Sequence, residues 1–284
     1  MRRILITGGA GNVGGSLARR LVEDPNNFVL ILDNLLTGSI TKLPDSKYKN
    51  WQFINADVNN LKEILQIFKH ESLDYVFHYA AVVGVKRTLA DPIAVLKDVD
   101  GVKNILQISN DLQVKRIFLS SSSEVYGEPI DQNKFLTEGD FGYLDPMNVR
   151  SCYAESKRLG ETMCASWSSQ FGLNTTVVRP FHTYGPGMYL DDGRVFADFV
   201  SNIVDSKNII LKSDGSSVRA FCYIRDATEG LIQLLLKGES GAAYNLGNPS
   251  QETSMKDLAL MLCDVFPERK LSLEFSKEAN GILN

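Results

Sequence analysis

The sequence is poor in the residues that usually hold metal-bound or disulfide-linked folds together. It has four cysteines and three histidines, and they show none of the paired spacings typical of zinc sites or disulfide frameworks. Its formal net charge is -4, so no basic excess exists to hold a nucleic acid or an anionic membrane. No apolar run approaches the roughly 20 residues that cross a bilayer. These absences argue against zinc, nucleic acid and membrane, and they predict a cytoplasmic protein with reduced thiols.

The composition that remains is that of a globular chain of 284 residues, 44% hydrophobic and 23% charged. Short apolar runs alternate with helical stretches over the first 179 residues. This alternation predicts an α/β fold with a Rossmann-type, doubly wound parallel sheet covered by helices on both faces. The expected strands are 3–7, 28–33, 51–56, 75–79, 116–120 and 174–179, and the expected helices are 13–23, 61–70, 93–110 and 153–171.

After Arg179 the regular alternation stops and glycine, proline and aspartate gather in a loop-rich stretch. Helices are expected beyond it at 195–205, 226–237 and 255–266, with a strand at 208–211. We therefore predict a Rossmann domain over 1–179 and a smaller, mainly substrate-binding α/β lobe over 180–284. Interweaving of the two is left open.

A glycine-rich loop joins the first expected strand to the first expected helix. Gly8 permits a tight turn, Gly11 lets the backbone approach a pyrophosphate, and Gly14 allows the helix to lie close to the strand. Asn12 and Val13 open the helix, where unpaired N–H groups attract an anion. The pattern therefore predicts a dinucleotide site.

An acid ends the second expected strand, as a dinucleotide site requires. Asp33 lies 19 residues after Gly14, where it can accept hydrogen bonds from the adenosine ribose and repel a 2′-phosphate. No basic residue stands in the following segment, which begins with Asn34, so NAD is predicted rather than NADP. Asp57 and Val58 are expected near the adenine, although Asp57 also suits a helix N-cap.

Tyr153 and Lys157 are spaced to share one face of a helix. A phenol becomes a useful base for an alcohol when a nearby cation stabilises its phenolate, and Lys157 can supply that cation. The same pair also occurs where a helix merely buries a ring and extends an amine to solvent. The serine-rich segment 120–123 adds candidate hydroxyl groups.

Taken in order, these motifs resemble the extended short-chain dehydrogenase/reductases. The resemblance implies a retained NAD, a nucleotide-diphosphate sugar as substrate, and a homodimer paired through the helices 93–110 and 153–171. It implies Tyr153 as the base, Lys157 as its partner and ribose ligand, and Ser122 as the hydroxyl bound to the sugar oxygen at C4. Four further motifs contribute to the resemblance: His78-Tyr79-Ala80-Ala81, Val125-Tyr126-Gly127, Arg179-Pro180-Phe181 and Tyr184-Gly185-Pro186. Within the first of these, Ala80 is expected to contact the cofactor.

Within this family the chain is most similar to the UDP-glucuronate decarboxylases, because Ser123 and Glu124 follow Ser122. Glu124 and Arg219 are then expected to handle the carboxylate and the enolate proton. Arg219 also suits a diphosphate clamp or a surface ion pair, and Glu124 also suits an indirect hydrogen-bonding role.

Several positions depart from the family's pattern or leave its chemistry open. His182 stands where an Asn is common in the family, and it is either an altered substrate ligand or a packed loop residue. Asp98 also stands where an Asn is frequent. Ser123, His182, Arg194 and Arg219 are the expected substrate-binding residues. The alternatives are a nucleotide-sugar 4-epimerase, a 4,6-dehydratase, or a non-enzymatic NAD(H) sensor or scaffold. The resemblance also predicts a final helical stretch beyond Asn284, the last residue of this sequence.

Overall fold

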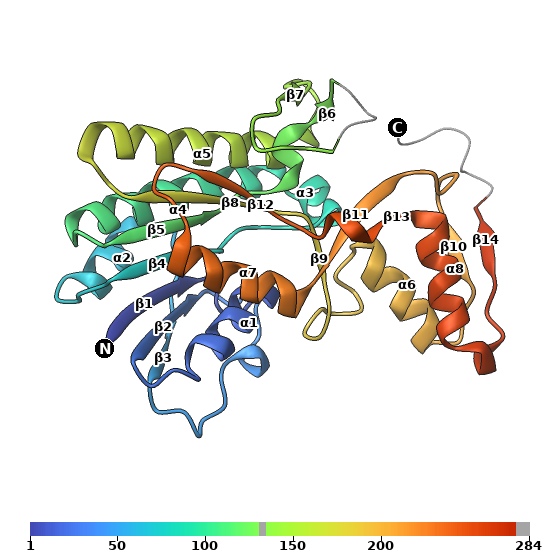
Figure 1. Cartoon of the computed structure of the whole chain (residues 1–284), viewed down its shortest axis with the longest axis horizontal. Helices are drawn as coiled ribbons and strands as arrows, with labels where there is room; N and C mark the ends of the chain where they lie inside the picture. The colour runs from blue at the N-terminus through green and yellow to red at the C-terminus, as the bar shows by residue number, and fades with distance from the viewer. Residues whose placement is uncertain (131–134, 277–284) are drawn as a thin grey trace. The chain divides into compact units, whose positions relative to one another are not determined.

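The structure is a computed structural model that describes residues 1–130 and 135–276 (Figure 1). It forms two compact units. The first contains Met1–Phe181 and Ile224–Leu246, and the second contains His182–Tyr223 with the described residues from Gly247 onward. The expected boundary after Arg179 lies close to the first crossing between the units. A single boundary does not describe the division, because Ile224–Leu246 returns to the first unit.

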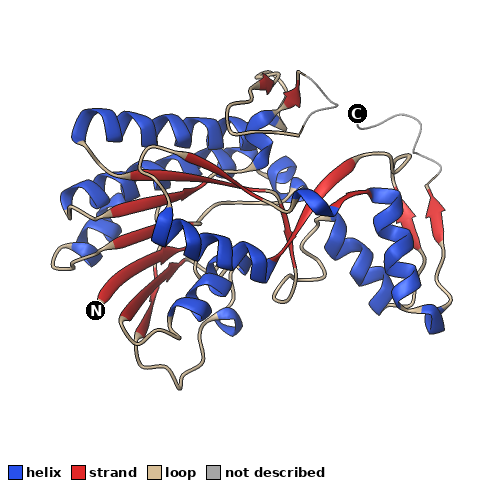
Figure 2. Ribbon diagram, in the orientation of Figure 1, coloured by secondary structure: helices blue, strands red, loops and turns tan. Residues whose placement is uncertain are grey.

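The first unit is built on a parallel sheet of seven strands, which Figure 2 shows with helices on both faces. The strand order is β12-β8-β5-β4-β1-β2-β3, so the direction of winding reverses between β1 and β4. Ligands of such sheets bind outside the carboxyl ends of the strands at this reversal. The strands are β1 Arg2–Thr7, β2 Asn27–Asp33, β3 Trp51–Asn55, β4 Tyr75–His78, β5 Arg116–Ser120, β8 Thr175–Pro180 and β12 Ala243–Leu246.

Helices cover both faces of this sheet. On one face α2 (Leu61–Phe68), α4 (Pro92–Asp111) and α5 (Ser151–Phe171) bury a continuous apolar core against the strands. On the other face α1 (Asn12–Leu21) lies beside α7 (Ile224–Lys237) (Figure 1). The short helix α3 (Val85–Ala90) precedes α4, and a small hairpin joins β6 (Glu128–Pro129) to β7 (Gly142–Tyr143).

The second unit holds a three-stranded sheet and two helices of its own. Its strands are β9 (His182–Tyr184), β11 (Val218–Tyr223) and β13 (Glu252–Ser254). Phe199, Phe221 and Leu258 belong to its core, to which α6 (Val195–Val204) and α8 (Met255–Val265) contribute. A separate parallel pair joins β10 (Ile209–Leu211) to β14 (Leu273–Phe275).

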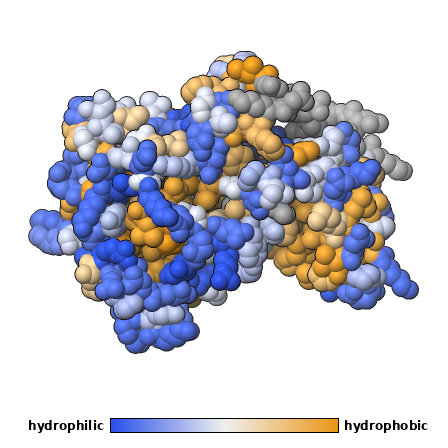
Figure 3. Space-filling model, in the orientation of Figure 1, coloured by the Kyte–Doolittle hydropathy of each residue, from blue (hydrophilic) through white to orange (hydrophobic). Residues whose placement is uncertain are grey.

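The surface of the second unit is partly apolar over α6 and α8 on the face seen in Figure 3. Leu260, Met261 and Val265 are all more than two-fifths exposed on α8. Helix α8 thus presents apolar side chains both to its core and to the surface. In the part of the chain that the structure describes, no helix combines the length and hydropathy needed to traverse a bilayer, and a cytoplasmic location stays a prediction.

Candidate active site

The glycine loop adopts a backbone that larger residues would disrupt. Gly8 has φ +67°, and a Cβ there would lie 2.6 Å from the backbone nitrogen of Ala80. The amide of Gly11 donates to the carbonyl of Gly8 at 3.0 Å, and a Cβ on Gly14 would collide with the same carbonyl. The loop is therefore a tight turn whose glycines are sterically required.

Helix α1 begins directly in this loop, at Asn12. Its N-cap Gly11 provides no side-chain acceptor, so the first amides of the helix lack that partner. Both polar atoms of the Asn12 side chain are buried and have no hydrogen-bond partner within the described residues. Free donors at a helix N-terminus suit an anion, so this loop fits the pyrophosphate of a dinucleotide.

Asp33 is buried at the end of β2, and the backbone fixes its carboxylate. One oxygen accepts the amide of Ala10 at 3.0 Å, and the other accepts the amide of Leu35 at 2.8 Å. Each carboxylate oxygen can accept a further hydrogen bond. Asp33 therefore presents a fixed negative charge that can bind ribose hydroxyls, and it also has a structural role that the sequence did not show.

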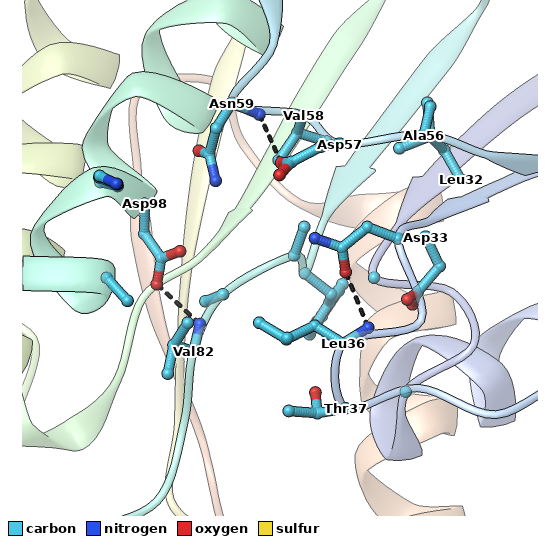
Figure 4. A pocket seen from close by; sticks show the side chains of 18 residues that line it. Leu32, Asp33, Leu36, Thr37, Ala56, Asp57, Val58, Asn59, Val82 and Asp98 are labelled. Atoms are coloured by element: carbon cyan, nitrogen blue, oxygen red, sulfur yellow. Dashed lines mark hydrogen bonds between the residues drawn. The ribbon is translucent and has the colours of Figure 1, made fainter. Parts of the chain in front are cut away.

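A pocket opens beside this loop at the carboxyl ends of the strands (Figure 4). Seven of the expected cofactor residues line it: Gly8, Gly11, Asp33, Asn34, Asp57, Val58 and Ala80. Asp57 accepts the amide of Asn59 at 2.9 Å, whereas the N-cap of α2 is Asn60. The N-cap role considered for Asp57 is therefore wrong.

The remaining expected cofactor residues do not line this pocket. They are Asn12, Val13, Gly14, Tyr153 and Lys157. The lining instead includes residues that sequence reasoning did not assign to the cofactor, among them Leu36, Thr37, Asn59, Val82, Lys97 and Asp98. Most of these residues follow the end of a strand, and this position was the sequence signal that could have identified them. Lys97 and Asp98 lie on α4, and their place in the lining depends on how that helix packs, which the sequence did not show.

Helix α5 carries Tyr153 and Lys157 one turn apart. The Nζ of Lys157 donates to the carbonyl oxygen of Ser120 at 2.9 Å and lies 5.8 Å from the centre of the Tyr153 ring. One residue later, Arg158 donates to the carbonyl of Val125 at 2.8 Å. These bonds tie α5 to both sides of the segment that holds Ser122 and Glu124.

Ser122 is buried just beyond the end of β5 and is the N-cap of a short 3₁₀ helix, η2 (Ser123–Tyr126). Its Oγ accepts the amide of Glu124 at 3.1 Å, and its hydroxyl proton remains able to bond a substrate oxygen. The Glu124 side chain is exposed on η2. The first unit therefore brings Ser122, Ser123 and Glu124 together with the α5 pair.

The electrostatics around Lys157 differ from those of a surface lysine. Burial lowers its pKa, while the negative charge of Asp98 raises it. Burial and the positive charge of Lys157 lower the pKa of His78 to about 3. The Nδ1 of His78 lies 2.7 Å from the Oγ1 of Thr7, so the neutral imidazole is held inside the sheet.

The second unit brings the other expected residues within electrostatic reach of one another. His182 lies on β9, and burial with the charges of Arg219 and Arg194 lowers its pKa to about 4. Its ring centre is 5.8 Å from that of Phe221. Arg219 is exposed on β11 and donates to the carbonyl of Val218 at 2.8 Å, whereas Arg194 pairs with Asp192. This cluster is cationic and partly aromatic.

The parallel sheet, glycine loop and Tyr–Lys helix define the class as a Rossmann-type dinucleotide-binding protein. Residues 4–247 match the NAD dependent epimerase/dehydratase family. The chain belongs to this family, whose cofactor is NAD, and the resemblance found in the sequence is confirmed.

Two similar proteins are UDP-glucuronic acid decarboxylases. UDP-glucuronic acid decarboxylase 6 of Arabidopsis thaliana is 34% identical over 256 residues, covering 89% of this chain and 71% of that protein. UDP-glucuronic acid decarboxylase 1 of Xenopus tropicalis is 35% identical over 263 residues, covering 92% of this chain and 59% of that protein.

Solved structures with the same fold include an epimerase and a dehydratase. The UDP-N-acetylglucosamine 4-epimerase of Methanobrevibacter ruminantium matches with a TM-score of 0.86 and 26% identity, covering 99% of this chain and 87% of the other. The dTDP-glucose 4,6-dehydratase of Streptomyces venezuelae, solved with NAD bound, matches with a TM-score of 0.83 and 26% identity, covering 98% and 86%. The expected α/β fold class is thereby confirmed.

Proposed function

We propose that this protein is an NAD-dependent nucleotide-sugar enzyme that oxidises the sugar at C4, and that it acts as a UDP-glucuronate decarboxylase. The observation that best supports an enzymatic role is the hydrogen bond from Lys157 to the carbonyl of Ser120. It joins the helix that holds Tyr153 to the strand that leads into Ser122. Similarity to the two decarboxylases supports the choice of substrate.

The chain's own residues fit NAD. Gly8, Gly11 and the opening amides of α1 at Asn12 and Val13 would hold the pyrophosphate, and Asp33 the adenosine ribose. When bound, NAD accepts a hydride and returns it. Asn34, Asp57, Val58 and Ala80 would complete the wall of the adenine and ribose pockets.

Tyr153 is proposed to take the proton of the C4 hydroxyl. A phenol has an unperturbed pKa of about 10, so it needs stabilisation of its phenolate to act at neutral pH. The Lys157 ammonium, 5.8 Å from the Tyr153 ring centre, would provide it and would also bind the nicotinamide ribose. Ser122 would donate a hydrogen bond to the same sugar oxygen and fix its position.

Oxidation at C4 turns a hexuronic acid into a β-keto acid, which can lose CO2 when its electrons are accepted at C4. Glu124 is proposed to manage the enolate proton and Arg219 to position the carboxylate. Ser123, His182 and Arg194 would contact the substrate. The cationic environment of His182 supports an anionic ligand, such as a diphosphate, at that cluster.

A 4-epimerase or a 4,6-dehydratase is the second candidate, supported by the two solved structures at 26% identity. Both reactions require the same proton removal at C4 and differ only in the fate of the oxidised sugar. A sensor or scaffold needs no acid–base group, so the preserved set of Ser122, Tyr153 and Lys157 argues against a non-enzymatic role.

The test is a panel of UDP-glucuronate, UDP-glucose, UDP-N-acetylglucosamine and dTDP-glucose, with products followed by mass spectrometry. We expect loss of CO2 from UDP-glucuronate alone. Loss of water would favour the dehydratase, and a change of sugar configuration without a change of mass would favour the epimerase. Tyr153→Phe is the control for a contaminating activity.

We also propose that the protein is a homodimer paired through α4 and α5. The support is the resemblance to the family together with exposed apolar side chains on these helices, such as Ile93, Leu96 and Leu159. Light scattering at micromolar concentration should give twice the mass of one chain. The mass of a single chain would contradict this proposal.

A further inference from the structure

Asp98 is a carboxyl group in the wall of the cofactor pocket that the proposed reaction does not use. It lies on α4, and one of its oxygens accepts the backbone amide of Val82 at 2.7 Å (Figure 4). Among the described residues, no side-chain nitrogen of a lysine, arginine or histidine lies within 4.0 Å of its carboxylate oxygens. A negative charge is thus held in the wall without a direct counter-ion.

Two charged groups from other elements act on Asp98, and a third lies on its own helix. Lys157 of α5 attracts it, Asp57 from the loop after β3 repels it, and Lys97 of α4 lines the same pocket. Burial raises the pKa of Asp98 to about 6, so the carboxyl is mostly ionised at neutral pH. The negative charge of Asp98 therefore acts on Lys157 through space.

The two redox forms of the cofactor differ in charge at the nicotinamide, which the proposed function places beside Lys157. The oxidised nicotinamide ring carries a positive charge, and the reduced ring is neutral. A lysine ammonium alone would repel the cationic ring, whereas a nearby carboxylate offsets that repulsion. Electrostatic interactions of this kind persist in a pocket shielded from water.

We propose that Asp98 is a specificity-determining residue of the cofactor site, whose charge offsets that of Lys157 and favours oxidised over reduced cofactor. This inference rests on the proposed function, because it takes the nicotinamide to lie beside Lys157. It goes further in predicting which redox form the pocket prefers and which side chain sets the preference.

The experiment measures dissociation constants for NAD by calorimetry and for NADH by fluorescence, at about pH 8. It compares the unchanged protein with Asp98→Asn and with Asp100→Asn, a matched change of an exposed acid on the same helix. We expect Asp98→Asn to shift the preference toward NADH by about tenfold, which corresponds to about 1.4 kcal/mol for the loss of one partly screened charge. Asp100→Asn should leave the ratio unchanged.

A second measurement separates the charge from the shape of the side chain. Lowering the pH of the unchanged protein from about 8 to about 5 protonates Asp98 and should reproduce the shift, while Asp98→Asn should show little change over that range. His78, with its pKa near 3, does not titrate there. Asp33 and Asp57 line the same pocket in both proteins, so the difference in pH response between the unchanged protein and Asp98→Asn reports Asp98.

The outcomes are distinct. A purely structural role would weaken both redox forms equally in Asp98→Asn, and an unaltered ratio with both forms bound would overturn the inference. If the unchanged protein bound neither form, the cofactor site of the proposed function would fail as well. Circular dichroism of each variant confirms that it is folded.

Discussion

Arg179 and Glu161 form a two-point ion pair, with Nε to Oε1 at 2.9 Å and Nη2 to Oε2 at 2.7 Å. The pair joins β8 to α5, and the side chains are only 9% and 17% exposed. Glu161 also accepts the hydroxyl of Ser121, and Arg179 donates to the hydroxyl of Tyr126 at 3.0 Å. The ion pair thereby holds Ser121 and Tyr126, which lie on either side of Ser122 and Glu124.

Replacing Arg179 with lysine should destabilise the protein, because one ammonium cannot replace a planar two-point donor. We expect a loss of about 2–4 kcal/mol in the free energy of unfolding, as for a buried pair that loses part of its partner. Urea unfolding measures it. Arg20→Lys is the control, since the exposed Arg20–Glu229 pair should contribute less than about 1 kcal/mol. Equal losses in both variants would contradict the expectation.

Tyr153→Phe keeps the aromatic ring and removes the proposed base. Turnover should fall by a factor of about 10²–10⁴, the range for loss of a general acid–base group, while NAD still binds. Steady-state kinetics and calorimetry measure the two quantities. Tyr143→Phe, on an exposed tyrosine, serves as the control. Unchanged turnover would remove Tyr153 from the mechanism.

Asp33→Ala should reduce the preference for NAD over NADP, because it removes the charge that repels a 2′-phosphate. It should also lower stability by about 1–3 kcal/mol, since the amides of Ala10 and Leu35 lose their acceptor. Asp33→Asn removes the negative charge but keeps one side-chain oxygen as an acceptor. It therefore separates the effect on cofactor preference from the effect on stability. Calorimetric titration with both cofactors tests this, and tighter binding of NADP by the unchanged protein would refute the assignment.

Glu124→Ala should separate the two halves of the proposed decarboxylation. The C4 oxidation does not need Glu124 directly, so substrate should bind and reduced nicotinamide should accumulate in the absorbance spectrum. CO2 release should be small. Arg219→Ala should impair carboxylate positioning as well. Full product yield from Glu124→Ala would leave the epimerase or dehydratase as the better proposal.

Acid should destabilise the protein through His78. Its pKa falls from 6.5 in the unfolded chain to about 3 in the folded protein, so the unfolded state binds more protons between these values. Stability is therefore lost as the pH falls through that window, by up to about 1.4 kcal/mol per pH unit. Asp98 acts oppositely, because its raised pKa favours the folded state in acid. Urea unfolding at several pH values should show a smaller slope for His78→Asn.

The sequence predicted the regular elements of the sheet well, because fully buried parallel strands are short and apolar on both faces. The predicted 116–120 agrees with β5, and each end of the other long predicted elements lies within two residues of the observed one. β12 was not predicted. It has only four residues, from Ala243 to Leu246, and its pairing with β8 is a long-range contact that no local pattern reveals.

Local motifs were enough to predict the tight glycine loop between β1 and α1 and the placing of Tyr153 and Lys157 one turn apart on a helix, and their functional roles stay predictions. The hydrogen bond from Ala10 to Asp33 and the place of Asp98 in the pocket wall could not be predicted, because both depend on contacts between residues distant in the sequence. The roles of Ser122, Glu124 and Arg219 stay predictions. Their chemistry depends on a bound substrate rather than on local pattern.

The pairing of β12 with β8 has a consequence for how the chain matures. During synthesis β8 emerges more than sixty residues before β12, so its outer edge stays unpaired in the growing chain. Asn245 of β12 is also the residue that accepts the hydroxyl of Tyr126, at 2.6 Å, on the segment after Ser122. Ser122, which we propose binds the substrate, thus gains the support that Asn245 gives to Tyr126 only after residue 245 has left the ribosome. A product halted near residue 181 would expose a bare edge of β8 that is prone to aggregation.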